Sequence, residues 1–361
     1  MSLSETFPAT FFQNGSKAGS KRRKRGEGVT IKDIAKESGY AISTVSRALN
    51  NHPDVSEEAK RRISEIVAER GFVPNSNARQ LKRQQAKCIA FIVKGTTNMF
   101  FSDMLVELQR RVSESGYDGV VQYLAEGDDE VALAQQLCRE LKPKGLIFLG
   151  GDSRNFASGF SEVKVPSVLA TTVSGELQFD NLSMVGVDDR AAGRRAIDYL
   201  MENGHRRIAV IGGDPEDSSP GRMRLAGCKE SFEAHGLAFD EAMFLPACFS
   251  WDEGYAAMKR FLDGGGEATA VFAMSDVQAV GAIRAILDSG RTVPGDISVL
   301  GFDGTPVARF YNPTLATLRQ PAAEIAKTSV KLVLGCIERQ RPAKTVLLEA
   351  ELLPGGSVRA L

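Results

Sequence analysis

Apolar residues recur along this chain with two different periods. Near the amino terminus they follow helical spacing in three short segments: Ile31, Ile34 and Ala35; Ile42, Val45 and Leu49; and Ile63, Ile66 and Val67. Such spacing predicts three short helices within residues 29–73, packed around one small core. Gly39 lies between the first two helices and can adopt the positive φ that a tight turn requires.

From Cys88 onward, apolar runs of strand length alternate with amphipathic segments. The runs are residues 88–93, 118–124, 145–150, 167–171, 207–213, 270–275 and 296–303, and the clearest helical segments are 101–116, 191–203 and 277–290. This alternation predicts an α/β fold of doubly wound parallel sheets with helices on both faces. The length accommodates two half-domains of roughly 130 residues each.

Charge divides the chain at the same place. The formal net charge is zero, but residues 1–87 carry +8 and residues 88–361 carry −8. A basic tail is expected over residues 1–28, which end in "SKRRKRGEG". A basic head on an acidic body is typical of a nucleic-acid-binding module joined to another domain, although a merely solvated head would have the same charge.

The remaining composition limits the cellular setting. No segment resembles a signal peptide, and no run approaches the roughly 18 to 20 apolar residues that span a bilayer. The five cysteines are scattered and never spaced as C-x-x-C. We therefore expect a cytoplasmic protein with buried, reduced thiols.

The second predicted helix is unusually polar on its outer side, where it presents Ser43, Thr44, Ser46, Arg47 and Asn50. Two helices joined by a short glycine-bearing turn form a helix-turn-helix, whose second helix enters the DNA major groove. Hydroxyl and guanidinium groups there bind base edges and phosphates. A plain helical bundle is the alternative interpretation of the same pattern.

Several motifs strengthen the first interpretation. "VTIKDIAKESGYAISTVSRALNN", "NARQLKR", "RMRLAGC" and "VPGDISVLGFD" are collinear with, and strongly resemble, the LacI/GalR family of bacterial transcriptional regulators. The resemblance implies a helix-turn-helix headpiece (29–74), a hinge helix and linker (75–87), and a two-lobed periplasmic-binding-protein-like body (88–361). It also implies homodimers or tetramers that bind operator DNA and a small effector.

The resemblance assigns individual roles in DNA binding. Ile42 and Ser43 match the family's base readers, Arg47 its arginine for bases or phosphates, and Thr44 and Ser46 the hydroxyls that touch the backbone. The full predicted DNA-binding set is Thr30, Ile42, Ser43, Thr44, Ser46, Arg47, Asn50, Asn75, Ala78, Arg79, Leu81 and Lys82. Ala41 departs from the family's capping serine, so that either the cap is lost or Ser43 compensates for it.

The hinge prediction depends on Ala78 and Leu81. By resemblance the segment folds on the operator, where both residues face the minor groove and Leu81 wedges into a central base step. A simple solvated linker is the alternative.

Motif positions at the carboxyl ends of strands predict the effector pocket, since ligands of α/β sheets bind there. The predicted pocket residues are Asn98, Phe100, Phe101, Asp188, Arg224, Trp251, Asp276, Asp303 and Gln320. Aromatic rings can stack on a sugar, and carboxylates with an arginine can bind its hydroxyls. For Asp276 a structural helix cap, and for Trp251 a core position, compete with ligand contact.

Other functions find less support. The chain lacks G-x-G-x-x-G, a P-loop and G-x-S-x-G, and its three histidines are far apart, so we expect no enzyme, no cofactor and no metal. A periplasmic solute-binding protein without a regulatory role fits the body alone, and a structural nucleoid binder fits the head alone.

Overall fold

The computed structural model describes residues 30–49, 54–70, 87–95, 99–213 and 219–361. The chain divides into two compact units between Gln84 and Gln85. Predicted DNA-binding residues Asn50, Asn75, Ala78, Arg79, Leu81 and Lys82, the predicted hinge helix, and the predicted pocket residue Asn98 lie outside the described residues.

The first unit contains the three predicted helices, α1 (Ile31–Ser38), α2 (Ile42–Leu49) and α3 (Glu57–Arg70). Their buried core consists of Ile34, Ala35, Val45 and Ile63. Gly39 has a φ of 76° at the end of α1, as the turn between α1 and α2 requires. Ile42, which has the apolar spacing of α2 and is also a predicted base reader, is 44% exposed at the first position of α2.

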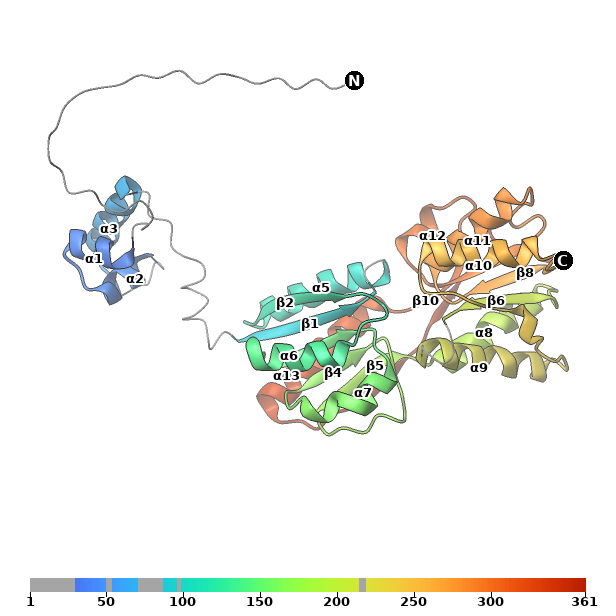
Figure 1. The fold of residues 1–361 in the computed structure, drawn as a ribbon, viewed down its shortest axis with the longest axis horizontal. Helices are drawn as coiled ribbons and strands as arrows, with labels where there is room; N and C mark the ends of the chain where they lie inside the picture. Colours follow the sequence, from blue (N-terminus) through green and yellow to red (C-terminus); the bar gives the residue numbers. More distant parts are fainter. Residues whose placement is uncertain (1–29, 50–53, 71–86, 96–98, 214–218) are drawn as a thin grey trace, which may run out of the picture. The chain divides into compact units, whose positions relative to one another are not determined.

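The second unit consists of two α/β lobes (Figure 1). Lobe 1 contains β1 (Cys88–Lys94), α5 (Phe100–Glu114), β2 (Asp118–Leu124), α6 (Glu130–Glu140), β3 (Gly145–Leu149), α7 (Ser153–Gly159), β4 (Ser167–Ala170), β5 (Leu182–Val187), α13 (Ala322–Arg339) and β11 (Thr345–Leu348). A short 3-10 turn, Phe160–Glu162, follows α7.

Lobe 2 contains α8 (Asp189–Glu202), β6 (Ile208–Gly212), α9 (Ser219–Ala234), β7 (Phe244–Pro246), α10 (Trp251–Asp263), β8 (Ala270–Ala273), α11 (Asp276–Asp288), β9 (Ser298–Asp303), α12 (Pro306–Phe310), β10 (Ala316–Arg319) and β12 (Glu351–Leu353). A 3-10 turn, Glu241–Met243, precedes β7.

Both sheets have six strands in the same spatial order, β2-β1-β3-β4-β5-β11 and β7-β6-β8-β9-β10-β12. All neighbouring strands are parallel except β10 and β12, which are antiparallel. The chain crosses between the lobes after β5, after β10, and again between β11 and β12. Consequently α13, which comes late in the sequence, packs into the core of lobe 1.

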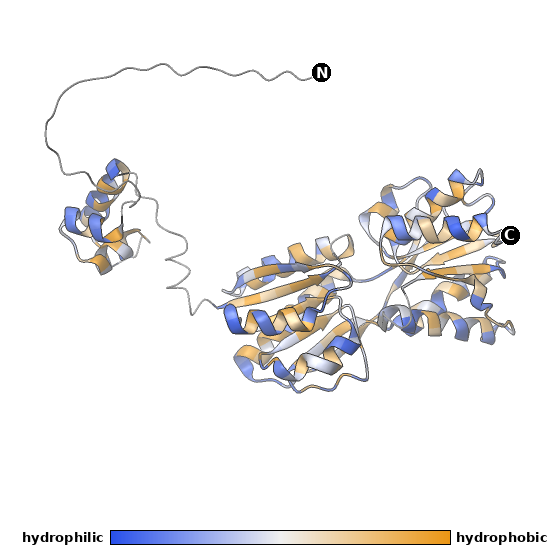
Figure 2. Ribbon diagram, in the orientation of Figure 1, coloured by the Kyte–Doolittle hydropathy of each residue, from blue (hydrophilic) through white to orange (hydrophobic). Residues whose placement is uncertain are grey.

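The predicted doubly wound sheets are confirmed, because their central strands are buried on both faces. β1, β3, β8 and β9 consist almost entirely of buried residues, and Figure 2 shows the hydrophobic colouring concentrated on the strands within each lobe. All seven predicted strands are present. The prediction missed five strands, β5, β7, β10, β11 and β12.

Candidate functional site

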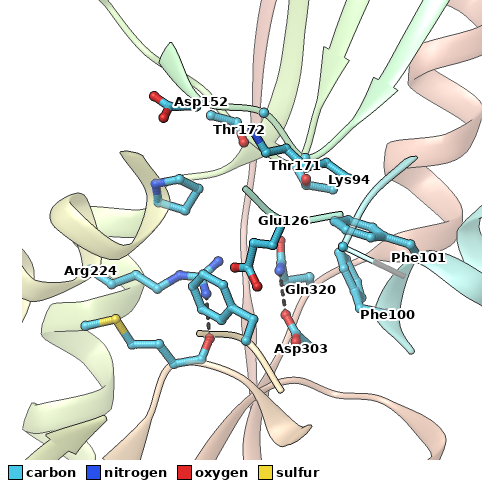
Figure 3. A pocket seen from close by; sticks show the side chains of 16 residues that line it. Lys94, Phe100, Phe101, Glu126, Asp152, Thr171, Thr172, Arg224, Asp303 and Gln320 are labelled. Carbon is cyan, nitrogen blue, oxygen red and sulfur yellow. Dashed lines mark hydrogen bonds between the residues drawn. The ribbon is translucent and has the colours of Figure 1, made fainter. Parts of the chain in front are cut away.

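A pocket lies where loops at the carboxyl ends of strands from both lobes meet (Figure 3). Its lining residues are Lys94, Gly95, Phe100, Phe101, Glu126, Gly150, Gly151, Asp152, Thr171, Thr172, Pro220, Arg224, Phe249, Met274, Asp303 and Gln320. Open α/β sheets place ligand sites at this edge, as the sequence predicted.

Arg224, on α9, is the pocket's buried cation. Its Nε donates to Asp189 Oδ1 at 2.8 Å, and its Nη1 donates to the Met274 carbonyl oxygen at 2.6 Å. The guanidinium carbon lies 3.7 Å from the centre of the Phe302 ring. Burial raises the pKa of Asp189, and the charge of Arg224 acts in the opposite direction. These contacts fix the plane of the guanidinium at the pocket wall.

Asp303 ends β9 in a backbone conformation that residues with a side chain rarely adopt, with a φ of 111°. Burial raises the pKa of its carboxyl to about 8, with Arg224 lowering the pKa and Asp276 raising it. Oδ1 accepts a hydrogen bond from Gln320 Nε2 at 2.8 Å. The fold therefore holds a strained, buried carboxyl at the pocket (Figure 3).

Two buried polar atoms lack a hydrogen-bond partner. Among the described residues, Thr172 Oγ1 and Gln320 Oε1 are the buried side-chain nitrogen or oxygen atoms for which no partner is found. Thr172 follows β4 in lobe 1, and Gln320 follows β10 in lobe 2. Both residues line the pocket, so a polar ligand there could satisfy both atoms.

Lys94 ends β1 and brings a second cation to the pocket. Its Nζ lies 2.5 Å from Glu130 Oε2, and the Glu130 side chain is fully buried. Glu130 also accepts from the backbone N–H of Asp152 at 2.6 Å and from Asn155 Nδ2 at 3.0 Å. The buried carboxylate thus fixes the position of the lysine from behind.

Glu126 and Asp152 add two carboxyl groups from lobe 1. Although Glu126 is exposed as a residue, surrounding atoms desolvate its carboxyl and raise its pKa, while the backbone of Phe249 and the charge of Lys94 act in the opposite direction. In Figure 3 Glu126 lies between the labelled residues of the two lobes. Desolvation raises the pKa of Asp152, but hydrogen bonds from Arg154 outweigh it and the net pKa is lowered.

Aromatic rings supply the apolar part of the lining. Phe100 and Phe101, at the start of α5, are 5% and 8% exposed, with ring centres 5.8 Å apart. Phe249 reaches the pocket from the loop after β7 in lobe 2. Such rings can pack against the C–H face of a sugar.

The structure brings together five of the predicted pocket residues: Phe100, Phe101, Arg224, Asp303 and Gln320. It places three others outside the lining. Asp188 caps α8 by accepting from the backbone N–H of Ala191 at 2.9 Å. Asp276 is buried and accepts from Thr305 and Thr317 at 2.6 to 2.9 Å. Trp251 is half-buried at the start of α10. Asp188 and Asp276 thus serve backbone and hydroxyl donors at strand–helix junctions, and their ligand contacts stay predictions.

Sequence reasoning missed Lys94, Glu126, Thr172 and Phe249 in the lining, and Asp189 beneath Arg224. Lys94 ends a strand, and each of the others follows a strand by a few residues. Their position after a strand was the available signal, but it does not reveal which side chain turns inward.

The helix-turn-helix presents several of the predicted DNA-binding side chains. Ile42, Ser43 and Arg47 are exposed on α2, and Thr44 and Ser46 are half-buried. Thr30 is exposed before α1, and its N–H and hydroxyl donate to Asp33 Oδ2 at 3.0 and 2.8 Å. Arg47 Nε donates to Asp54 Oδ1 at 3.2 Å.

Neither a metal-binding cluster of three or more His, Cys, Asp or Glu residues nor a helix long and apolar enough to cross a membrane is found in the described part of the chain. Cys88 and Cys228 are buried, as expected, but Cys138 and Cys336 are only partly buried and Cys248 is exposed. The expectation of five buried thiols is therefore wrong, because Cys248 lies in the loop after β7.

Comparisons with known proteins place both units in one family. Residues 30–75 match the model described as "Bacterial regulatory proteins, lacI family", and residues 197–358 match "Periplasmic binding protein-like domain". HTH-type transcriptional regulator MalR of Clostridium butyricum is 34% identical over 333 residues, 90% of this chain and 98% of MalR. HTH-type transcriptional repressor CytR of Escherichia coli strain K12 is 31% identical over 344 residues, 94% of this chain and 99% of CytR.

Solved structures agree. The lac repressor bound to ONPG in the repressed state superposes with a TM-score of 0.74 at 26% identity, covering 92% of this chain and all of that one. A complex of the regulator CelR with cellobiose gives a TM-score of 0.68 at 27% identity, covering 91% of this chain and all of that one. Because these similarities include the headpiece, they do not support a solute-binding protein without a regulatory role. The chain belongs to the LacI family of DNA-binding bacterial transcriptional regulators.

Proposed function

We propose that this regulator binds a sugar or sugar derivative in the pocket between its lobes, and that this ligand changes its affinity for operator DNA. The proposal rests chiefly on Gln320 Oε1 and Thr172 Oγ1, two buried, unpartnered polar atoms from different lobes that line one pocket. A ligand that bonds to both would hold the lobes in one arrangement.

The rest of the lining suits a carbohydrate. Phe100, Phe101 and Phe249 offer ring faces, while Arg224 and Asp303 offer charge-assisted hydrogen bonds to hydroxyl groups. A relative supports this ligand class. The structure of the regulator CelR was solved as a complex with cellobiose.

A ligand screen tests the proposal. Neutral sugars, polyols, sugar acids and nucleosides would be screened by thermal shift, and each hit confirmed by calorimetry. Gln320→Leu should remove the response because it deletes one of the two unpartnered atoms, whereas Gln109→Leu, on the exposed side of α5, should keep it. A full response in Gln320→Leu would contradict the pocket assignment.

For the headpiece we propose that the exposed side of α2 reads the operator, with Ser43 and Arg47 selecting bases. Arg47→Ala should cost about 1 to 3 kcal/mol on a specific site and less on random DNA. Anisotropy titrations with both DNAs at one salt concentration would measure the two losses. Equal losses would mean that Arg47 contacts only phosphate.

The wider organisation is also proposed. A basic tail (1–28), a headpiece (29–74), a hinge and linker (75–87) and an effector-binding body (88–361) would act in a cytoplasmic, nucleoid-bound homodimer without catalytic activity. Two copies of Leu81 would then meet at the operator's centre and open one base step. Leu81→Ser should reduce the operator bend, measured by fluorescence transfer between the DNA ends, without changing ligand affinity.

A further inference from the structure

Both positively charged side chains in the pocket lining are paired with buried carboxylates. Its cations among the described residues are Lys94 and Arg224. Lys94 Nζ lies 2.5 Å from Glu130, whose side chain is fully buried. Arg224 Nε lies 2.8 Å from Asp189, and both side chains are 5% exposed. Each cation is therefore neutralised by a buried carboxylate behind the pocket wall.

Negative groups are in excess at the same place. Of the lining carboxyl groups, Asp152 pairs with Arg154 at 2.6 Å. Glu126 and Asp303 form no ion pair with any described residue, although both line the pocket (Figure 3). When all these groups are ionised, the lining and its immediate partners carry two more negative charges than positive ones.

Hydrogen-bonding capacity has the same bias. The atom in lobe 2 that lacks a partner, Gln320 Oε1, can only accept, and the Glu126 and Asp303 carboxyls each offer at least one accepting oxygen in either protonation state. A sugar hydroxyl can donate to such atoms. An ionised phosphate or carboxylate cannot, since it has no proton to give at neutral pH.

We propose that the pocket selects an uncharged, hydroxyl-rich ligand and rejects phosphorylated and carboxylated sugars. The inference rests on the proposed function and narrows its ligand class. An anionic group would bring negative charge beside the Glu126 and Asp303 carboxyls, where both lining cations are already paired with buried carboxylates. Desolvation raises the pKa values of both carboxyl groups, so the pocket disfavours the ionised form of an acid even without a ligand.

Matched ligands test this selectivity. Calorimetry on the full-length protein would compare glucose with glucose 6-phosphate, glucuronate and glucosamine, ribose with ribose 5-phosphate, and the neutral disaccharides maltose and cellobiose. We expect binding by at least one neutral sugar, and phosphate and carboxylate derivatives weaker by at least about tenfold. Tighter binding of an anionic sugar would overturn the inference but leave the proposed function standing. Tighter binding of glucosamine than of glucose would contradict the preference for an uncharged ligand but would support the rejection of anions.

Absence of binding by every sugar, to protein shown to be folded, would overturn the inference together with the proposed function. A charge-neutralising variant provides the internal test. Glu126→Gln should reduce the discrimination between a bound neutral sugar and its anionic derivative by about threefold or more. Glu162→Gln removes the same charge from an exposed site outside the lining and should leave the discrimination unchanged. An equal result for the two variants would show that Glu126 does not exclude anions.

Discussion

The two lobes have the same strand order but equip the pocket differently. In chain order, β4 is the fourth strand of lobe 1 and β9 is the fourth strand of lobe 2. Thr171 directly follows β4 and has a φ of 72°, and Asp303 is the last residue of β9 and has a φ of 111°. At this equivalent position lobe 1 has a neutral hydroxyl and lobe 2 a buried carboxyl. The pocket residues after β2 and β7, the second strands in chain order, differ in the same way: Glu126 lines the pocket from lobe 1 and Phe249 from lobe 2.

The two lobes therefore share the backbone conformation at this position but differ in the side chain that it carries. The positive φ at the end of the fourth strand recurs because it turns a side chain toward the space between the lobes. The surrounding sheet holds the backbone in this strained conformation. The side chain placed there differs, since two lobes that bind one asymmetric ligand need different groups. Both lobes place a buried ion pair behind the pocket wall, Lys94–Glu130 in lobe 1 and Arg224–Asp189 in lobe 2.

The largest expected effect comes from breaking the Arg224–Asp189 pair. Arg224→Ala should lower the free energy of unfolding by about 3 to 5 kcal/mol, because Asp189 would remain as a buried, unpaired charge. The double variant Arg224→Met with Asp189→Leu should recover most of this stability without recovering ligand binding. Urea unfolding and calorimetry would measure the two properties. A double variant as unstable as Arg224→Ala would contradict the ion-pair explanation.

Substitutions at the two fourth-strand positions, Asp303 and Thr171, should have the next largest effect. Asp303→Asn should raise the stability of the ligand-free protein at pH 7.5 by about 2 kcal/mol, because burial disfavours the charged carboxyl. The same change should weaken ligand binding by about tenfold or more, since charge-assisted bonds are lost. Thr171→Val, at the equivalent position of lobe 1, should change either property by less than about 1 kcal/mol. Similar effects at both positions would remove the functional difference between the lobes.

Asp303 should also give the ligand-free protein a pH-dependent stability. Its folded-state pKa of about 8 exceeds the usual 3.8, so between these values the folded state binds more protons than the unfolded state. Stability should therefore fall as pH rises from about 4 to about 8, by at most about 1.4 kcal/mol per pH unit. Asp276, with a pKa raised to about 6, contributes in the same direction, and His205, with a lowered pKa, in the opposite one. A shallower dependence in Asp303→Asn than in the wild type would isolate the contribution of Asp303, and parallel curves would contradict it.

The smallest predicted effect concerns Thr172. Thr172→Val removes a buried hydroxyl oxygen that has no partner, so the ligand-free protein should gain up to about 1 kcal/mol of stability. Ligand affinity should fall by a similar free energy if the ligand satisfies that oxygen. Thermal unfolding with and without ligand would show the two effects with opposite signs. A loss of stability without ligand would indicate that water already satisfies the hydroxyl.

Much of the fold was predictable because its central strands are buried on both faces and form continuous apolar runs. Strands β11 and β12 escaped prediction, since they are short, half exposed and separated from their sheet neighbours by long stretches of chain. Helical spacing alone does not tell which apolar residues of α2 face the headpiece core: Ile42 in the first turn is exposed, whereas Val45 is buried.

The pocket was predictable only in part. Arg224, Asp303 and Gln320 were identified from motifs, but Asp188 and Asp189 are adjacent acidic residues whose roles the sequence could not distinguish. The structure makes Asp188 a helix cap and Asp189 the partner of Arg224. A difference of one residue at a helix start changes the direction of the side chain by about 100°, and no local pattern reports which carboxylate turns inward.

The three chain crossings have a consequence for biosynthesis. Residues 88–187 form five of the six strands of lobe 1, but α13 and β11 come from residues 322–348, after most of lobe 2 has been made. A ribosome that adds about 5 to 20 residues per second would therefore expose the incomplete sheet edge of β5 and part of its core for several seconds or more. Lobe 1 is thus the segment of a nascent chain on which we expect a chaperone to act, and a stop codon shortly before Thr345 would leave both sheets without their sixth strand.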